Sequence, residues 1–150
     1  MADDIDVEYV ERALQIATTA HLGQRDKNGA PYIFHVLSVW EATRAQGCST
    51  ATQVVALLHD VVEDTDVTLR RIKSVFGYEI ADAVDAITKR RGESLDEYLV
   101  RVKSNALAWI VKAADSADNY RRLGNIADLD ERARLKRKYE HVLETLRPER

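Results

Sequence analysis

The sequence is poor in the residues that make turns and cross-links, with two prolines, six glycines and one cysteine among its 150 residues. So few prolines and glycines leave little turn chemistry for a many-stranded sheet. Alanine, leucine, glutamate, lysine and arginine are frequent instead, and these residues favour helices. Because Cys48 has no second cysteine to pair with, the chain cannot form an internal disulfide. We therefore expect a helical protein in a reducing compartment, namely the cytoplasm, although a single cysteine is compatible with other compartments as well.

The sequence also lacks a long hydrophobic run and a strong excess of one charge. No apolar stretch approaches membrane-spanning length, and the first residues are acidic and amphipathic, unlike a signal peptide. The formal net charge of −3 argues against electrostatic binding to DNA or to an anionic membrane. Nearby acidic residues dilute the basic run at residues 132–138, which predicts a solvated helix face. We expect neither nucleic acid nor membrane as a partner, and the oligomeric state stays open.

Apolar residues recur at helical spacing almost from end to end, and no repeat or linker divides the chain. The fold class that we predict is therefore all-α, a single compact helical bundle formed by residues 1–150. In the first helix the apolar stripe comprises Val7, Val10, Leu14, Ala17 and His21. Residues that commonly cap helix N-termini precede four later stripes: Ser49 or Thr50, Thr68, Ser94 and Asp128.

An acidic cluster with one histidine ends the most apolar predicted helix, in the stretch LLHDVVEDTD at residues 57–66. Residues three and four apart are neighbours on a helix, so the following side chains would gather at one end: His59, Asp60, Glu63 and Asp64. Carboxylates packed this closely raise one another's pKa values unless a cation compensates. A divalent metal ion is the simplest such cation, because imidazole and carboxylate ligands suit a borderline or hard ion. A capped or solvated helix end is the alternative.

Two polar residues elsewhere strengthen the metal interpretation. The segment PYIFH supplies a second imidazole, His35, and the segment VKAADSADN places Asp115 beside an apolar helical face. A carboxylate buried without a partner is strongly destabilising, so Asp115 needs a metal ion or a basic partner. The alternative is that Asp115 pairs with Lys112 or Arg122 on the surface.

The order His35, His59-Asp60, Asp115 resembles that of the HD-domain metal-dependent phosphohydrolases, which are named after the adjacent His-Asp pair. Longer segments between residues 20 and 119 resemble the hydrolase domain of the RelA/SpoT homologue family, which degrades the alarmone (p)ppGpp. These segments are AHLGQRDKNGAPYIFH, ALLHDVVEDT, FGYEI and VKAADSADN. The chain is accordingly identified as a small stand-alone member, and the resemblance implies a bundle of helices around one metal ion.

The resemblance also implies a role for each polar cluster. One divalent ion, usually Mn²⁺ in this family, would be ligated by His35, His59, Asp60 and Asp115. Glu63 and Asp64 match the pair that orients and deprotonates the attacking water. The residues implied in binding the nucleotide or its phosphates are Asn119, Lys27, Arg25 and Lys112, with Lys89 and Arg90 as further candidates. The expected reaction removes the 3′-pyrophosphate of (p)ppGpp or a related nucleotide by metal-activated water.

Some positions depart from the family pattern HxGQxRxxGxPY and its neighbours. Asp26 stands where the arginine that stacks on guanine is expected, Val36 replaces a proline, and ADSADN replaces ADRLHN. A carboxylate cannot stack on a base and repels phosphate, so either Arg25 takes over the stacking role or the substrate differs. The alternatives are an HD phosphatase or phosphodiesterase that acts on another nucleotide, and a non-catalytic module that senses a nucleotide.

Overall fold

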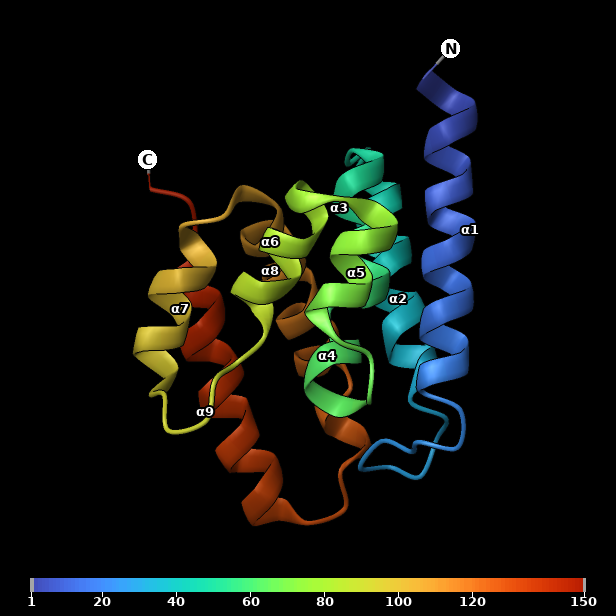
Figure 1. Ribbon diagram of the computed structural model, residues 1–150. Coiled ribbons are helices and arrows are strands. Elements are labelled where there is room, and N and C mark those ends of the chain that lie inside the picture. The colour runs from blue at the N-terminus through green and yellow to red at the C-terminus, as the bar shows by residue number, and fades with distance from the viewer. Residues whose placement is uncertain (1, 150) are drawn as a thin grey trace.

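Helices form nearly all of the regular structure in the computed structural model, which describes residues 2–149, with side chains from residue 7 onward (Figure 1). In chain order they are α1 (Ala2–Ala20), α2 (Ile33–Ala45), α3 (Thr50–Leu58), α4 (Val61–Asp64), α5 (Leu69–Phe76), α6 (Tyr78–Ile87), α7 (Leu95–Lys103), α8 (Ala106–Arg121), the 3₁₀ helix η1 (Leu123–Asn125) and α9 (Leu129–Leu146). Within the described range, extended pairing is limited to an isolated antiparallel bridge between Arg25 and Pro31. The predicted all-α fold is confirmed.

Side-chain caps begin the helices that the sequence predicted to be capped. Ser49 Oγ accepts a hydrogen bond at 3.2 Å from the third backbone N–H after it, at the start of α3. Ser94 and Glu97 form a reciprocal capping box at α7. Thr68 and Asp128 accept backbone hydrogen bonds at the starts of α5 and α9. A cap of this kind contributes about 1 kcal/mol, so these helix ends are determined by local sequence.

The centre of the bundle is α3, which is apolar on nearly all sides. Val54, Val55, Leu57 and Leu58 are fully buried, and α3 packs against α1, α2, α6 and α8. Complete burial of a side chain of this size contributes about 1.5–3 kcal/mol. The longer α8 contacts α3 and also packs against α2, α6, α7 and α9. These two central helices therefore hold the residues at the end of α3 and on α8 at a fixed separation.

The first helix packs against the bundle along only part of its length. Ala13, Ile16 and Ala17 are buried, whereas Val7 is 55% exposed. The main contacts of α1 are with α3, and its N-terminal turns extend beyond the neighbouring helices (Figure 1). The apolar stripe predicted for this helix therefore faces solvent at Val7, whereas Val10 and Leu14 of the same stripe pack against the core.

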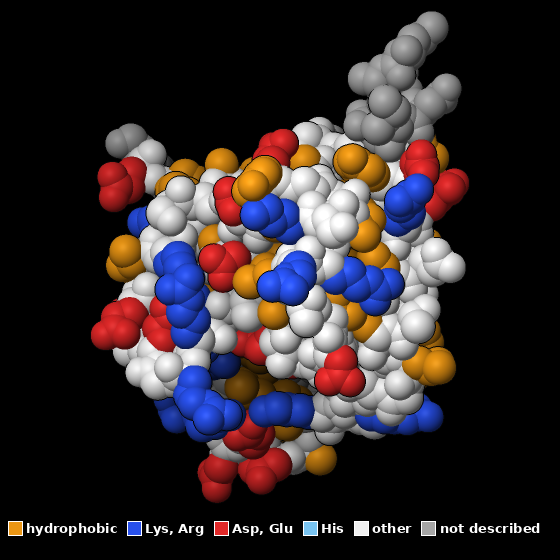
Figure 2. Space-filling view, viewed as in Figure 1, with side chains coloured by type: hydrophobic (Ala, Val, Ile, Leu, Met, Phe, Trp, Pro, Cys, Tyr) orange, Lys and Arg blue, Asp and Glu red, His pale blue; other side chains and the backbone are white. Residues whose placement is uncertain are grey.

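Charges of both signs are distributed over the surface. Figure 2 shows Lys and Arg side chains interspersed with Asp and Glu on one face, which agrees with the small net charge of −3. The lower half of this face is hollowed, and Lys and Arg side chains gather around the hollow. None of the helices in residues 2–149 combines the length and the apolar composition that crossing a bilayer requires.

Candidate metal centre

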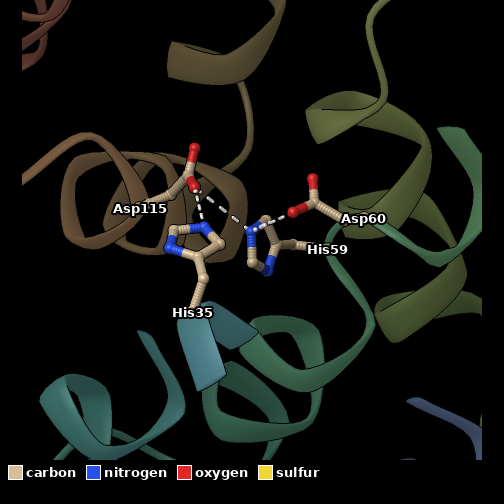
Figure 3. Close-up of side chains that lie close together, drawn as sticks. All are labelled: His35, His59, Asp60 and Asp115. Carbon is tan, nitrogen blue, oxygen red and sulfur yellow. Dashed lines mark hydrogen bonds and ion pairs between the residues drawn. The ribbon is translucent and has the colours of Figure 1, made fainter. Parts of the chain in front are cut away.

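Four side chains from three separate segments of the chain converge at one point in the bundle. His35 lies on α2, His59 follows α3, Asp60 precedes α4 and Asp115 lies on α8. One nitrogen or oxygen atom of each lies within 4.8 Å of those of the other three (Figure 3). The two histidines and Asp115 are buried, and the side chain of Asp60 is 13% exposed. The structure thus brings together all four residues that the sequence suggested as metal ligands.

The adjacent His59 and Asp60 reach the same point because the helix breaks between them. His59 is the C-cap of α3 and Asp60 is the N-cap of α4. In a continuous helix, neighbouring side chains point about 100° apart around the axis. Asp60 has φ −110° and ψ −3°, away from ordinary helical values. The break allows His59 Nε2 to lie 2.9 Å from Asp60 Oδ2.

The two imidazole rings are oriented by hydrogen bonds at Nδ1. His35 Nδ1 donates to Asp118 Oδ2 at 2.7 Å, and His59 Nδ1 donates to the carbonyl oxygen of Ala56 at 2.7 Å. Nε2 of both rings faces Asp115 Oδ1, at 2.7 Å from His35 and 3.3 Å from His59 (Figure 3). With the proton on Nδ1, each Nε2 directs a lone pair at the cluster, as a metal-ligating histidine requires.

The electrostatics of the cluster favour a cation at its centre. Carboxylate oxygens and imidazole lone pairs at these distances repel one another unless a proton or a metal ion lies between them. Burial alone would lower the pKa of His35, but its hydrogen bonds to Asp115 and Asp118 raise this pKa to about 9. Burial would raise the pKa of Asp115, but Lys112 and His35 hold it well below its usual value. The field that retains a proton on His35 would equally attract a metal ion.

The donor atoms of the cluster fit a divalent metal ion. Two imidazole nitrogens and two carboxylate oxygens suit a borderline or hard ion such as Zn²⁺, Mn²⁺ or Fe²⁺, and the cluster includes no sulfur that would favour a softer one. The hydrogen bonds at both Nδ1 atoms supply the outer contacts that usually support ligating histidines. The cluster is therefore able to hold a divalent ion.

Two further carboxylates lie on α4, one turn after Asp60. Glu63 Oε1 accepts a hydrogen bond from the backbone N–H of Lys89 at 3.2 Å, and Asp64 Oδ2 accepts one from Gln24 Nε2 at 3.4 Å. Burial and the charge of Asp60 raise the pKa values of both carboxyl groups. A carboxylate with a raised pKa accepts a proton more readily, so the pair is suited to general-base chemistry beside the cluster.

Lys112 and Asn119 contact the cluster from α8. Lys112 Nζ lies 2.9 Å from Asp115 Oδ2, and Asn119 Nδ2 donates to Asp115 Oδ1 at 3.3 Å. The side chains of Lys112 and Asp115 are only 19% and 6% exposed, so their ion pair is not a surface pair. Arg122 pairs with Asp118 instead, at 2.7 Å. The predicted pairing of Asp115 with Lys112 is therefore confirmed, but its placement on the surface is wrong, because α8 turns this carboxylate into the bundle.

Asp118 contacts a residue of the cluster and was not identified from the sequence. Its side chain is 8% exposed and fixes the ring of His35, while Arg121 and Arg122 lie 2.6 and 2.7 Å from its oxygens. Burial would raise the pKa of Asp118, but the hydrogen bonds from His35 and Arg121 lower it to about 2. A signal was present, because Asp118 follows Asp115 by three residues and shares its face of the helix.

Tyr32 is the second residue that sequence reasoning missed. Its hydroxyl donates to Asp60 Oδ2. Its ring packs between His21 and His35, at centroid distances of 5.1 and 5.6 Å. His21 lies outside the four-residue cluster and donates from Nδ1 to Gln24 Oε1 at 2.8 Å. The PYIFH segment thus contributes twice to the cluster: Tyr32 holds the carboxylate of Asp60, and His35 is itself one of the four clustered residues.

A cavity of about 260 Å³ extends from the cluster towards the loop before α2 and towards α9. It is lined by Arg25, Asp26, Lys27, Asn28, Tyr32, His35, Asn119, Arg122, Ile126, Leu135 and Tyr139. Three of the residues predicted to bind the nucleotide lie in this wall, namely Arg25, Lys27 and Asn119. Lys112, the fourth, is not among the lining residues. Lys27 Nζ lies 2.5 Å from Glu131 Oε1, so this lysine joins the loop to α9.

Several basic side chains lie close enough to Lys138 on α9 to affect its ionisation. Burial and the positive charges of Lys112, Lys89 and Arg134 lower the pKa of Lys138, which places these cations near one another. The hollow in Figure 2 is bordered by Lys and Arg side chains. Arg90, the remaining predicted candidate, lies 3.5 Å from Asp85. A small ligand with several negative charges would be attracted to this region.

Comparison with known proteins places these features in context. The pattern that defines the HD domain matches residues 13–138. Among solved structures, the chain superposes with a TM-score of 0.82 and 27% sequence identity on a metazoan orthologue of SpoT that hydrolyses ppGpp and plays a role in starvation responses. The superposition covers 93% of this chain and 85% of the other.

Curated relatives show the same similarity at the level of sequence. A probable GTP pyrophosphokinase of Mycobacterium leprae is 33% identical over 125 residues, which cover 77% of this chain and 16% of the relative. A guanosine-3′,5′-bis(diphosphate) 3′-pyrophosphohydrolase of Aquifex aeolicus is 32% identical over 124 residues, which cover 77% and 18%. The chain therefore spans less than a fifth of the length of these relatives.

Proposed function

The chain belongs to the HD domain family, and we propose that it is a metal-dependent hydrolase that removes the 3′-pyrophosphate of (p)ppGpp or a related nucleotide. The observation that carries this proposal is the convergence of two histidines and two aspartates, with the carboxylates of Glu63 and Asp64 one helical turn away. The names of the SpoT orthologue and of the Aquifex aeolicus relative support the choice of substrate.

We assign the roles of ligands for one divalent ion to His35, His59, Asp60 and Asp115, and Mn²⁺ is the ion that we propose. When bound, such an ion would polarise a phosphoryl oxygen and lower the pKa of a nearby water. The protein itself orients the ligands: Asp118 and the carbonyl of Ala56 fix the rings, and Tyr32 holds the carboxylate of Asp60.

Glu63 and Asp64 are the proposed acceptors of the proton that the attacking water loses. The water oxygen forms a bond to the phosphorus attached to the 3′-oxygen, and the bond between that phosphorus and the 3′-oxygen breaks. The 3′-oxygen takes up a proton and becomes the 3′-hydroxyl of the nucleotide, while the released pyrophosphate carries the water oxygen. The raised pKa values of both carboxyl groups support this role, because they lie closer to neutral pH than those of ordinary surface carboxylates.

The basic residues are proposed to bind the charged part of the substrate. Lys112, already paired with Asp115, adds positive charge directly beside the cluster. Lys27 and Arg25 line the cavity and can pair with phosphate oxygens. Asn119 can exchange hydrogen bonds with a ribose hydroxyl without adding charge.

Release of pyrophosphate from (p)ppGpp tests this function. We expect turnover with added Mn²⁺ and its loss with EDTA. We expect Asp60→Asn and Glu63→Ala to lower the rate by about a hundredfold or more, with an unchanged far-ultraviolet circular dichroism spectrum. Glu11→Ala, an exposed glutamate on α1, is the matched control and should keep full activity. Full activity in both site variants would exclude the mechanism.

The products and the binding behaviour distinguish the alternatives. Orthophosphate in place of pyrophosphate would identify a phosphatase, and cleavage of a phosphodiester would identify a phosphodiesterase. A nucleotide that raises the melting temperature without being hydrolysed would identify a sensing module.

The proposal includes the whole chain and its location. We propose that residues 1–150 form one hydrolase domain, which the match to the HD domain over residues 13–138 supports. A cytoplasmic location agrees with the single cysteine, because proteins of reducing compartments do not depend on disulfides.

A further inference from the structure

Asp26 is fixed in the wall of the cavity beside the cluster. Its Oδ1 atom accepts hydrogen bonds from the backbone N–H groups of Asn28 and Ala30, each at 2.9 Å. Its own backbone N–H donates to the carbonyl oxygen of Ala30 at 2.9 Å. These bonds hold the carboxylate in one direction, and Asp26 lines the cavity of about 260 Å³. The residue that replaces the stacking arginine of the family pattern is therefore a rigid part of the binding site.

The second carboxylate oxygen of Asp26 is available to a ligand. Within the described part of the chain, no side chain or backbone group donates a hydrogen bond to Oδ2, since both bonds made by this carboxylate go to Oδ1. The cations in the same wall have other partners: Arg25 bonds to the carbonyl of Gly29, Lys27 to Glu131, and Arg122 to Asp118. The cavity wall thus contains an oriented carboxylate whose Oδ1 atom holds the loop and whose Oδ2 atom accepts no hydrogen bond from the described residues.

The charges and apolar side chains around Asp26 determine which part of a nucleotide can lie beside it. A carboxylate repels phosphate, whereas Lys112 beside the cluster attracts it, so the 3′-phosphates lie at the cluster and away from Asp26. Ile126, Leu135 and Tyr139 line the same cavity and offer apolar surface to a planar ring. The part of the ligand beside Asp26 is therefore the base, presented by an edge that carries N–H donors.

Building on the proposed function, we propose that Asp26 selects guanine by accepting hydrogen bonds from the ring N1–H and the exocyclic 2-amino group. These donors are adjacent on guanine, and one carboxylate oxygen with two lone pairs can accept from both. Hypoxanthine retains only the N1–H, and adenine presents an N1 lone pair that repels the oxygen. A hydrogen bond to a charged group of this kind corresponds to a preference of about 10- to 100-fold.

Equilibrium binding measures this preference whether or not the nucleotide is hydrolysed. The probes are ppGpp and its inosine and adenosine counterparts, titrated in the presence of Mn²⁺ into Glu63→Ala protein so that turnover is slow. We expect affinities in the order guanosine, inosine, adenosine, with at least about a tenfold difference between the first and the last. In the Asp26→Asn variant the amide oxygen keeps the two loop hydrogen bonds, while an NH₂ donor replaces Oδ2. This variant should lose the guanine preference and bind the adenosine counterpart no more weakly than before.

The controls separate base selection from loop structure and from charge. Asp82→Asn changes the same charge at an exposed position on α6 and should keep the wild-type order. Equal affinities for the three bases, or no binding of any, would overturn the inference, as would an unchanged preference in Asp26→Asn. Uniform weakening for all bases in Asp26→Asn would assign the residue to loop structure alone. Wild-type protein that binds ppGpp selectively but releases no pyrophosphate would refute the proposed function and leave the base selection standing.

Discussion

At the scale of single residues, the contacts behind the ligands matter as much as the ligands. His35 can direct a lone pair at the cluster because its Nδ1–H donates a hydrogen bond to Asp118 Oδ2, at 2.7 Å. Asp118 is itself held by two arginines and has a pKa of about 2, so it remains charged over the whole physiological range. This arrangement fixes both the tautomer and the angle of the ring.

Replacement of Asp118 tests this role. We expect Asp118→Asn to weaken the affinity for Mn²⁺ by about 10- to 100-fold, because the ring loses its charged acceptor. Competition with a metal-sensitive dye measures the affinity. Arg121→Gln is the matched control, since it breaks an ion pair with the same carboxylate but does not contact His35. Equal affinities for the wild type and Asp118→Asn would show that the contact is only structural.

At the scale of elements, α3 positions the site because it is enclosed by other helices. Leu57 is fully buried two residues before His59 and lies in the hydrophobic core of the bundle. Any loosening of α3 moves His59 relative to Asp115 on α8.

Shortening a buried side chain of α3 should therefore reduce the stability of the protein. We expect Leu57→Ala to reduce the free energy of unfolding by about 2–5 kcal/mol, because it removes buried apolar contacts and leaves a cavity. Denaturation with urea measures the change. Val100→Ala removes apolar atoms at a position that is 72% exposed and should change the stability by less than about 0.5 kcal/mol. Similar losses in both variants would contradict the central role of α3.

The elements differ in how far the sequence alone determines them. Caps such as Ser94 with Glu97 are local patterns, so they could be predicted and are confirmed. The four clustered residues could be identified because a motif resemblance joined segments that are far apart in the chain. The spacing of Asp118 from Asp115 indicated a shared helix face, but its partner could not be assigned, because that partner is a ring from α2 that lies opposite it. The exposure of Val7 likewise depends on where the neighbouring helices end.

At the scale of the whole molecule, the cluster couples metal binding to folding. The four residues belong to segments between residues 35 and 115, so an ion bound to them would add a further link between helices that already meet through the apolar core and through buried hydrogen bonds. An ion at about a hundred times its dissociation constant stabilises the folded state by about 2.7 kcal/mol.

The stabilisation of the fold by a bound ion should increase with pH. In the metal-free protein the pKa of His35 is about 9, compared with 6.5 for an unperturbed histidine, so its protonation stabilises the fold below pH 6.5. That contribution is lost as the pH rises through 9, whereas metal binding requires the deprotonated ring. We therefore expect Mn²⁺ to raise the melting temperature more at pH 8.5 than at pH 6.5, as measured by differential scanning calorimetry. Equal shifts at the two pH values would contradict this account.

The single turn α4 has a consequence for how the protein can vary. This turn begins directly after Asp60 and contains Glu63 and Asp64, so one proposed ligand and both proposed proton acceptors lie within one short segment. The spacing between them is encoded within five consecutive residues and does not depend on how the surrounding helices pack. Substitutions that shift the other helices would therefore weaken the affinity for the ion, because the ion also needs ligands from α2 and α8. The same substitutions would affect proton transfer less.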